Sequence, residues 1–257
     1  MGLQSGGIGV WDLTTWKLVK WQVSSNWIGS VCFSADGNLI ACGSPGFLFV
    51  VETTSGKVIR KFRNEGRWLT SLALSPDGKQ LVAANWGSGV TVYDLASEQA
   101  VKSLPTLTSF GGIVRFSPDG QFLIGGGGSM IQIWDAIQFE KRGSLRGHKG
   151  NVSTFCFGPD GSTLVAGSAD GEARLWEFPG RPDQLSLLGH RGNLREVAFS
   201  PDGQRLVSGG IDNTARVWDT RTGQELLTFR GHKGFVTAVA WSPDGKRIAS
   251  GDTGDPR

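Results

Sequence analysis

A four-residue turn sequence recurs along the 257-residue chain, and its spacing constrains the fold more than any other feature. Ser-Pro-Asp-Gly, or a near copy, begins at Ser34, Ser75, Ser117, Gly158, Ser200 and Ser242, in steps of 41 or 42 residues. An apolar-acidic pair, such as Trp134-Asp135 or Trp218-Asp219, keeps the same period. A third marker, Gly-His, occurs at Gly147, Gly189 and Gly231, again 42 residues apart. Three markers with one period indicate an array of structural repeats.

Each repeat predicts four short strands, which we call a, b, c and d. In the fifth repeat they are Leu194–Phe199, Arg205–Ser208, Ala215–Trp218 and Glu225–Phe229. The Pro-Asp-Gly between a and b predicts a tight turn, because Pro presets φ, Asp bonds its own backbone and Gly accepts positive φ. No helical periodicity interrupts this pattern, so the sequence predicts an all-β fold.

These repeats resemble the WD40 repeat family, bacterial members in particular, most strongly over residues 131–250. The resemblance implies a β-propeller, here one domain over residues 1–257 with six blade-equivalents of four antiparallel strands. The chain opens with a c strand (Gly7–Trp11) and a d strand (Trp16–Trp21) and stops after a b strand (Arg247–Ser250). These end strands are expected to complete one blade and close the ring. The open alternative is a fragment of a longer repeat array.

In the WD-repeat family, a His before strand a bonds an Asp in the b–c turn, and a strand-b Ser or Thr and the strand-c Trp complete the chain. The resemblance therefore implies structural rather than catalytic histidines. The sets are His190, Asp212, Ser208 and Trp218; His148, Asp170 and Trp176, with Ala166 in place of the Ser; and His232, Ser250, Asp252 or Asp255, with Trp11 if the ring closes. The first three blades lack the His, so we expect them to be held mainly by apolar packing.

A candidate partner site lies where each innermost strand begins, seven residues before each a–b turn. That column reads Trp27, Trp68, Phe110, Asn151, Asn193 and Phe235. In a propeller it surrounds one mouth of the central channel, and a closed ring would join its four aromatics into an arc. Large exposed aromatics mark interaction sites, although rings that fold inward to brace the loops are the alternative.

Basic residues accompany this column. Lys149, Arg191 and Lys233 directly follow the three histidines, and Arg67 and Arg195 lie near the mouth. Basic and aromatic side chains together suit an acidic peptide or protein segment. Arg115 stands apart, because small residues occupy its place in the other inner strands and the sequence assigns it no partner.

Other classes of protein find little support. The chain has no apolar run long enough for a membrane helix, no signal peptide and an odd count of three cysteines without C-x-x-C. We therefore expect a cytoplasmic protein without cofactor, metal, membrane or small-molecule substrate. Catalytic motifs are missing, and the run Gly125–Gly128 is interpreted as a b–c turn rather than a nucleotide loop.

The predicted function is a non-catalytic scaffold that binds a peptide or protein segment. One alternative is a nucleic-acid-binding propeller, which the small net charge of +3 makes the less favoured reading. Another is a sensor or regulatory module cut from a larger multidomain bacterial protein.

Overall fold

The computed structural model of this chain describes residues 6–12, 14–65, 68–105, 112–179 and 184–254. Their regular elements are 24 β-strands, so the prediction of an all-β fold is confirmed. Within these ranges, no helix has the length and apolar character needed to cross a membrane.

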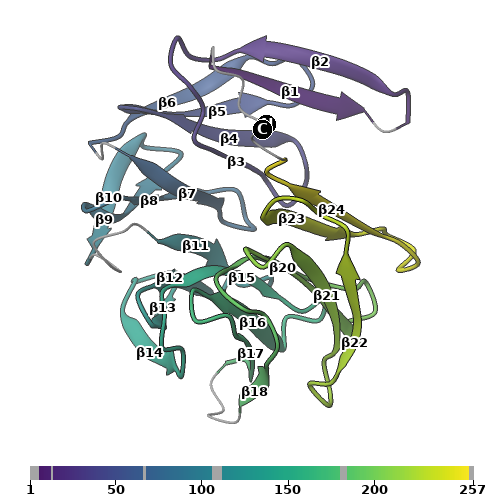
Figure 1. Ribbon diagram of the computed structural model, residues 1–257. Helices are drawn as coiled ribbons and strands as arrows, with labels where there is room; N and C mark the ends of the chain where they lie inside the picture. The colour runs from purple at the N-terminus through teal and green to yellow at the C-terminus, as the bar shows by residue number, and fades with distance from the viewer. Residues whose placement is uncertain (1–5, 13, 66–67, 106–111, 180–183, 255–257) are drawn as a thin grey trace. The chain divides into compact units, whose positions relative to one another are not determined.

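Twenty of the strands form five four-stranded sheets, which we call blades 1 to 5. In each blade, consecutive strands are neighbours, in the order a, b, c, d (Figure 1). Blade 1 is β3 (Ser30–Phe33), β4 (Leu39–Ser44), β5 (Phe47–Glu52) and β6 (Val58–Arg63). Blade 2 is β7 (Leu69–Leu74), β8 (Gln80–Asn85), β9 (Gly89–Asp94) and β10 (Gln99–Leu104). Blade 3 is β11 (Ile113–Phe116), β12 (Phe122–Gly127), β13 (Met130–Asp135) and β14 (Lys141–Arg146). Blade 4 is β15 (Val152–Phe157), β16 (Thr163–Ser168), β17 (Ala173–Glu177) and β18 (Gln184–Leu187). Blade 5 is β19 (Leu194–Phe199), β20 (Arg205–Gly210), β21 (Thr214–Asp219) and β22 (Glu225–Arg230).

The other four strands form two separate antiparallel pairs. One pair is β1 (Gly7–Asp12) with β2 (Lys17–Gln22), and the other is β23 (Val236–Trp241) with β24 (Ile248–Asp252). The chain divides into two compact units: unit 1 holds residues 1–125 and 134–140, and unit 2 holds residues 126–133 and 141–257. Each strand pair lies in a different unit. Ring closure, which would join the two pairs in one blade, therefore stays a prediction.

The burial of strand d differs along unit 2. Leu187, in β18, is 1% exposed, whereas Phe229, at the same repeat position in β22, is 43% exposed. The strands that follow β22 in unit 2 are the pair β23–β24. Phe229 thus lies on a part of blade 5 that this two-stranded sheet leaves uncovered.

The repeated turn has the geometry that its sequence predicts. In blade 5, the Ser200 hydroxyl donates to Asp202 (2.5 Å) and accepts the Arg205 amide (2.9 Å), while Gly203 has a φ of 71°. The turn also touches its neighbour: a Cβ added to Gly203 would lie 3.4 Å from the Pro159 ring of the preceding turn. The same arrangement joins Gly120 to Pro76 and Gly245 to Pro201, at 3.5 and 3.6 Å. One short sequence therefore shapes the turn and places it against the next.

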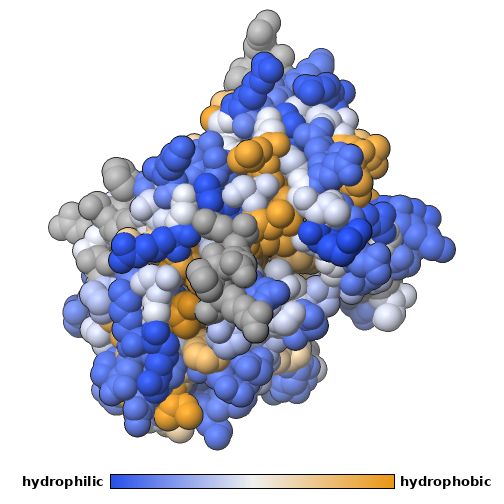
Figure 2. All heavy atoms as spheres, turned by 90° about the horizontal axis from the view of Figure 1, so that it is seen from below, coloured by the Kyte–Doolittle hydropathy of each residue, from blue (hydrophilic) through white to orange (hydrophobic). Residues whose placement is uncertain are grey.

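The core lies between sheets. In unit 2, Val165 and Leu187 of blade 4 pack in one cluster with Leu194, Leu206 and Trp218 of blade 5. Such burial of apolar side chains between successive blades is the main stabilising contribution to a fold of this kind. On the face shown in Figure 2, hydrophobic side chains form separate patches within a largely hydrophilic surface.

The prediction of a turn over Gly125–Gly128 is wrong. Strand β12 continues through Gly127, and only Gly128, with a φ of 60°, lies beyond it. The glycines serve packing instead. A Cβ on Gly126 would lie only 3.0 Å from the Phe155 ring and from Val152, so a larger residue would push strand a of blade 4 away.

Candidate partner-binding site

The connection that precedes strand a of blade 5 is fixed by a buried chain of hydrogen bonds. His190 Nδ1 lies 2.9 Å from Asp212, in the β20–β21 turn, and His190 Nε2 lies 2.7 Å from the Ser208 hydroxyl. The Trp218 indole N–H donates to the same hydroxyl at 2.8 Å. Because that oxygen accepts from Trp218, its own proton is free for His190, and the Nδ1 proton goes to Asp212.

The electrostatics of this chain favour a neutral imidazole beside a charged carboxylate. Burial lowers the pKa of His190, and the Asp212 carboxylate offsets this only in part. Burial acts to raise the pKa of Asp212, but hydrogen bonds from the Arg191 amide, His190 and Thr214 outweigh it and hold that pKa far below its ordinary value. At neutral pH the network therefore holds a neutral imidazole between a carboxylate and a hydroxyl.

Arg216 extends this network, and the sequence analysis missed it. Its side chain is 7% exposed and forms ion pairs with Asp212 (3.4 Å) and Glu225 (2.6 Å). A buried guanidinium needs such partners, since an unpaired charge there would be strongly unfavourable. Arg216 thereby ties strand c to strand d and to the β20–β21 turn.

The two other histidines have shorter networks. His148 Nδ1 lies 3.3 Å from Asp170, but its Nε2 is buried with no hydrogen-bond partner, because Ala166 stands where blade 5 has Ser208. His232 lies 2.9 Å from Asp252 and 2.7 Å from the Ser250 hydroxyl. Asp255 lies outside the described residues. Trp11, the indole expected beside Ser250, belongs to unit 1 and is 60% exposed, so its role there stays a prediction.

Polar hydrogen bonds also occur in unit 1, beside the apolar packing that the sequence predicts to hold these blades. Asn64 and Asn85, 4% and 3% exposed, exchange two amide hydrogen bonds of 2.9 and 3.0 Å. Asn64 precedes strand a of blade 2, as His190 precedes that of blade 5, and Asn85 ends strand b. A Ser24–Ser44 hydrogen bond of 3.1 Å makes the equivalent link in blade 1. No signal in the sequence marks the asparagine pair, because counting from the a–b turn places Glu65 and Gly87 at the His and Asp positions of the repeat.

Two members of the aromatic column meet in unit 1. The Trp27 and Trp68 rings lie 5.8 Å apart at 35°, and the side chains remain 38% and 57% exposed. Trp27 folds back over Gly29, where a Cβ would lie 2.6 Å from its ring. The rings therefore brace blades 1 and 2 against each other and still present an aromatic surface.

Three further members of the column belong to unit 2. In unit 2, Phe235 is 46% exposed, Asn151 is exposed and Asn193 is half-buried. Phe110, and Arg67 of the basic set, lie outside the described residues. A continuous aromatic arc across both units stays a prediction.

The basic residues of unit 2 occupy equivalent places beside the histidine networks. The amides of Lys149 and Arg191 donate to Asp170 (2.7 Å) and Asp212 (3.0 Å), while both side chains are exposed. Lys233 and Arg195 are exposed as well. The backbone of each connection is thus fixed, and its cation faces solvent.

Arg115 has found a partner that the sequence did not suggest. Its guanidinium donates to the Ser71 hydroxyl (3.2 Å) in strand a of blade 2 and to the carbonyl of Val114 (3.0 Å). The side chain remains exposed. It links two inner strands of unit 1 through neutral acceptors.

Six segments of the sequence match the WD domain, G-beta repeat family: residues 17–50, 56–94, 107–135, 139–177, 182–219 and 223–255. The chain belongs to the WD40 repeat family. The matches are offset from the blades by one strand: residues 139–177, for example, cover strand d of blade 3 and strands a to c of blade 4. In this family each repeat supplies four strands of a β-propeller.

Several known proteins are similar to parts of the chain. A eukaryotic translation initiation factor 3 subunit I from Bombyx mori is 24% identical over 176 residues, 63% of this chain and 54% of that protein. An uncharacterized WD repeat-containing protein from Synechocystis is 32% identical over 110 residues, 42% of this chain and 32% of that protein. The U3 small nucleolar RNA-associated protein 21 of Saccharomyces cerevisiae is 23% identical over 173 residues, 66% of this chain and 18% of that protein. This WD40 chain thus spans between 18% and 54% of the length of these relatives.

Proposed function

We propose that this WD40 chain is a non-catalytic scaffold that binds an acidic segment of a partner protein through the connections between strands d and a in unit 2. One observation carries the proposal: Lys149, Arg191 and Lys233 repeat at one position of three successive connections, each exposed and each next to a histidine network.

The networks matter because they hold the nearby carboxylates. Asp170 and Asp212 accept hydrogen bonds from a histidine and a backbone amide each, and only 9% of either side chain is exposed. Among the described residues, no acidic side chain forms an ion pair with Lys149, Arg191 or Lys233. These cations are available to a carboxylate or phosphate from another molecule, where paired charges steer association and set specificity.

Aromatic side chains supply the apolar part of the proposed surface. Phe235 lies two residues after Lys233 and is 46% exposed. Exposed aromatics beside cations are the composition that protein interfaces favour. A closed ring would add the Trp27–Trp68 pair to the same surface, and this extension depends on closure.

The relatives support the class of function rather than the partner. Two of them are named as a subunit of a translation initiation factor and as a protein associated with a small nucleolar RNA. Both names describe members of assemblies, which fits a scaffold. A fold by itself does not define function, so the charge pattern carries the proposal.

The test is fluorescence anisotropy with a fluorescein-labelled peptide of alternating Glu and Ser around a central Phe. The triple variant Lys149→Glu, Arg191→Glu, Lys233→Glu should weaken binding by about tenfold to a hundredfold, since each exposed pair contributes up to about 1 kcal/mol. A matched triple variant, Arg221→Glu, Lys246→Glu, Arg247→Glu, makes the same charge change at exposed positions at the other end of the strands and should bind almost normally.

Two outcomes would contradict the proposal. Equal losses in both triple variants would mean that only net charge matters. Tighter binding of a single-stranded oligonucleotide than of the peptide, with a steep dependence on salt, would favour the nucleic-acid alternative instead.

A further inference from the structure

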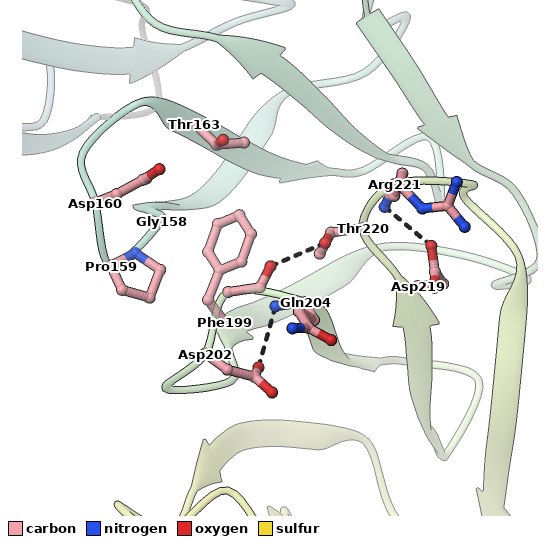
Figure 3. Close-up of a pocket in the computed structure, with 11 residues that line it drawn as sticks. Gly158, Pro159, Asp160, Thr163, Phe199, Asp202, Gln204, Asp219, Thr220 and Arg221 are labelled. Carbon is pink, nitrogen blue, oxygen red and sulfur yellow. Dashed lines mark hydrogen bonds between the residues drawn. The ribbon is translucent and has the colours of Figure 1, made fainter.

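A pocket of about 510 Å³ opens at the other end of the strands of unit 2, between blades 4 and 5. Its walls are the a–b turn of blade 4, with Asp160, the a–b turn of blade 5, with Asp202, and the c–d turn that carries Asp219. The Phe199 ring stands between the two a–b turns (Figure 3). The pocket therefore combines an aromatic ring with three carboxylates and one cation, Arg221, whose backbone amide donates to Asp219 at 3.0 Å.

One repeat further along, the corresponding place is filled by the chain itself. The Arg205 guanidinium lies over the Trp241 ring, 4.9 Å from its centroid. It donates to the Gly245 carbonyl at 3.3 Å and lies 4.0 Å from the Asp202 carboxylate. Stacking on an aromatic ring with a carboxylate beside it is a favourable setting for a guanidinium.

The two places are equivalent by the repeat. Each member of the Arg205 site has a counterpart 42 residues earlier in the pocket: Thr163 for Arg205, Phe199 for Trp241, Asp160 for Asp202 and Gly203 for Gly245. The residue that pairs with this position on the neighbouring strand is acidic in both places: Arg205 pairs with Asp219, and Thr163 pairs with Glu177. Thr163 is too short to reach over Phe199, so the space that a guanidinium takes in one interval is a pocket in the other.

The interval between blades 2 and 3 shows that this combination is not a general result of the repeat. A cavity also lies there, lined by Gln80, Asp77 and Ile137. The ring equivalent to Phe199 is Phe116, which is only 9% exposed and does not line it. That cavity has carboxylates but no accessible ring.

The turn of blade 4 also departs from its repeat in a way that shapes the pocket. Gly158 replaces the serine that holds the aspartate in the other turns, and Asp160 instead accepts from Ser162, at 3.0 Å from its amide and 2.6 Å from its hydroxyl. These hydrogen bonds hold the pKa of Asp160 below its ordinary value, so its carboxylate stays charged. Gly158 itself lines the pocket.

The geometry points to a binding site for an arginine side chain of a partner protein, with its guanidinium over Phe199 and beside Asp160, as Arg205 lies over Trp241 and beside Asp202. This site lies at the opposite end of the strands from the proposed acidic-segment surface and does not depend on it. Arginine is preferred to lysine because its planar group both stacks and bonds two acceptors.

The test is NMR titration of the full chain with the peptide acetyl-Gly-Arg-Gly-amide, followed by the amide signals of residues around Phe199. Thr163→Arg places the chain's own guanidinium in the pocket and should abolish binding of the peptide. Thr163→Val, the matched control, keeps the side chain short and should leave affinity unchanged. Asp160→Asn should weaken binding by about tenfold, because the charge beside the ring is lost.

Ligand controls separate the chemistry. The citrulline peptide, uncharged but of the same shape, should bind at least about tenfold more weakly, and a lysine peptide should lie between the two. Free L-arginine that binds as well as the peptide would mean a small-molecule site and would overturn the assignment to a partner protein.

Other results would overturn the site as a whole. One is that the amide signals around Phe199 in the native chain do not shift when the arginine peptide is added. The other is that the native chain and Thr163→Arg bind this peptide equally well. The folding of Thr163→Arg is checked independently by its circular dichroism spectrum and by cooperative thermal unfolding, which should match those of the native chain.

Discussion

Ala166→Ser should stabilise blade 4, because it supplies the hydroxyl that blade 5 has and blade 4 lacks. In blade 5, the Ser208 hydroxyl joins His190 (2.7 Å) to the Trp218 indole (2.8 Å). In blade 4, Nε2 of His148 is buried without a partner. The new hydroxyl would reach that nitrogen and the Trp176 indole.

The magnitude follows from the count of bonds. Two hydrogen bonds contribute about 1 kcal/mol each, and pairing the orphan nitrogen removes a desolvation penalty of about 1–3 kcal/mol. Ala166 is fully buried, so an added atom costs about 1 kcal/mol or more in strain. The net gain expected is about 2 kcal/mol, or a rise in Tm of about 4–8 °C for a chain of this size.

The assay is calorimetric unfolding together with amide hydrogen exchange of strands β16 to β18, which localises the effect to blade 4. Ala166→Val is the matched control, since it adds volume without a hydroxyl and should destabilise. The reciprocal change, Ser208→Ala, should cost blade 5 about 2–3 kcal/mol by creating the same orphan nitrogen. If the free energy of unfolding of Ala166→Ser were no higher than that of Ala166→Val, the hydrogen-bond reasoning would be refuted.

Three further predictions concern the ends, the pH dependence and the amide pair. In a cysteine-free background, Val10→Cys with Ala249→Cys should form an intrachain disulfide at low protein concentration if the ring closes; only reduced or intermolecular products would argue for open ends. Because the pKa of His190 is lowered from 6.5, the unfolded chain binds a proton below about pH 6.5 that the folded chain does not. The free energy of unfolding should therefore fall as the pH drops below about 6.5, by up to about 1.4 kcal/mol per pH unit. His190→Gln should flatten that slope in urea titrations, and an unchanged slope would exclude His190 as its source. Asn64→Ala should cost about 1–3 kcal/mol by leaving the Asn85 amide unpaired, and the double change to leucine should cost less; equal losses would contradict this account.

Much of the fold could be predicted because the repeat signals are local. Pro-Asp-Gly specifies its own turn, and the 42-residue period places each strand within a few residues. The Gly125–Gly127 segment was misread because glycine usually marks a turn, whereas here it makes room for Phe155 of the next blade. That reason lies between sheets and is not visible in a single repeat.

The candidate sites show the same limit. The basic residues could be found by comparing equivalent positions, since their exposure follows from their place in the repeat. The pocket beside Phe199 could not, because it depends on the absence of a long side chain at Thr163 and on how far Arg205 reaches over Trp241. Whether a ring lies open or covered is decided by side-chain length across two blades.

The contact between a turn glycine and the proline of the turn before it, seen at Gly120, Gly203 and Gly245, has an evolutionary consequence. Five of the six copies of the repeat carry both halves of the joint, a proline for the copy that follows and a glycine for the copy that precedes, and the first copy has Ala35 in place of the proline. A gene duplication that inserts one more copy therefore creates two new joints that already fit. The array can lengthen without prior adaptation of its neighbours, while the side chains beside each joint remain free to diverge into sites as different as an arginine stacked on a tryptophan and an open pocket.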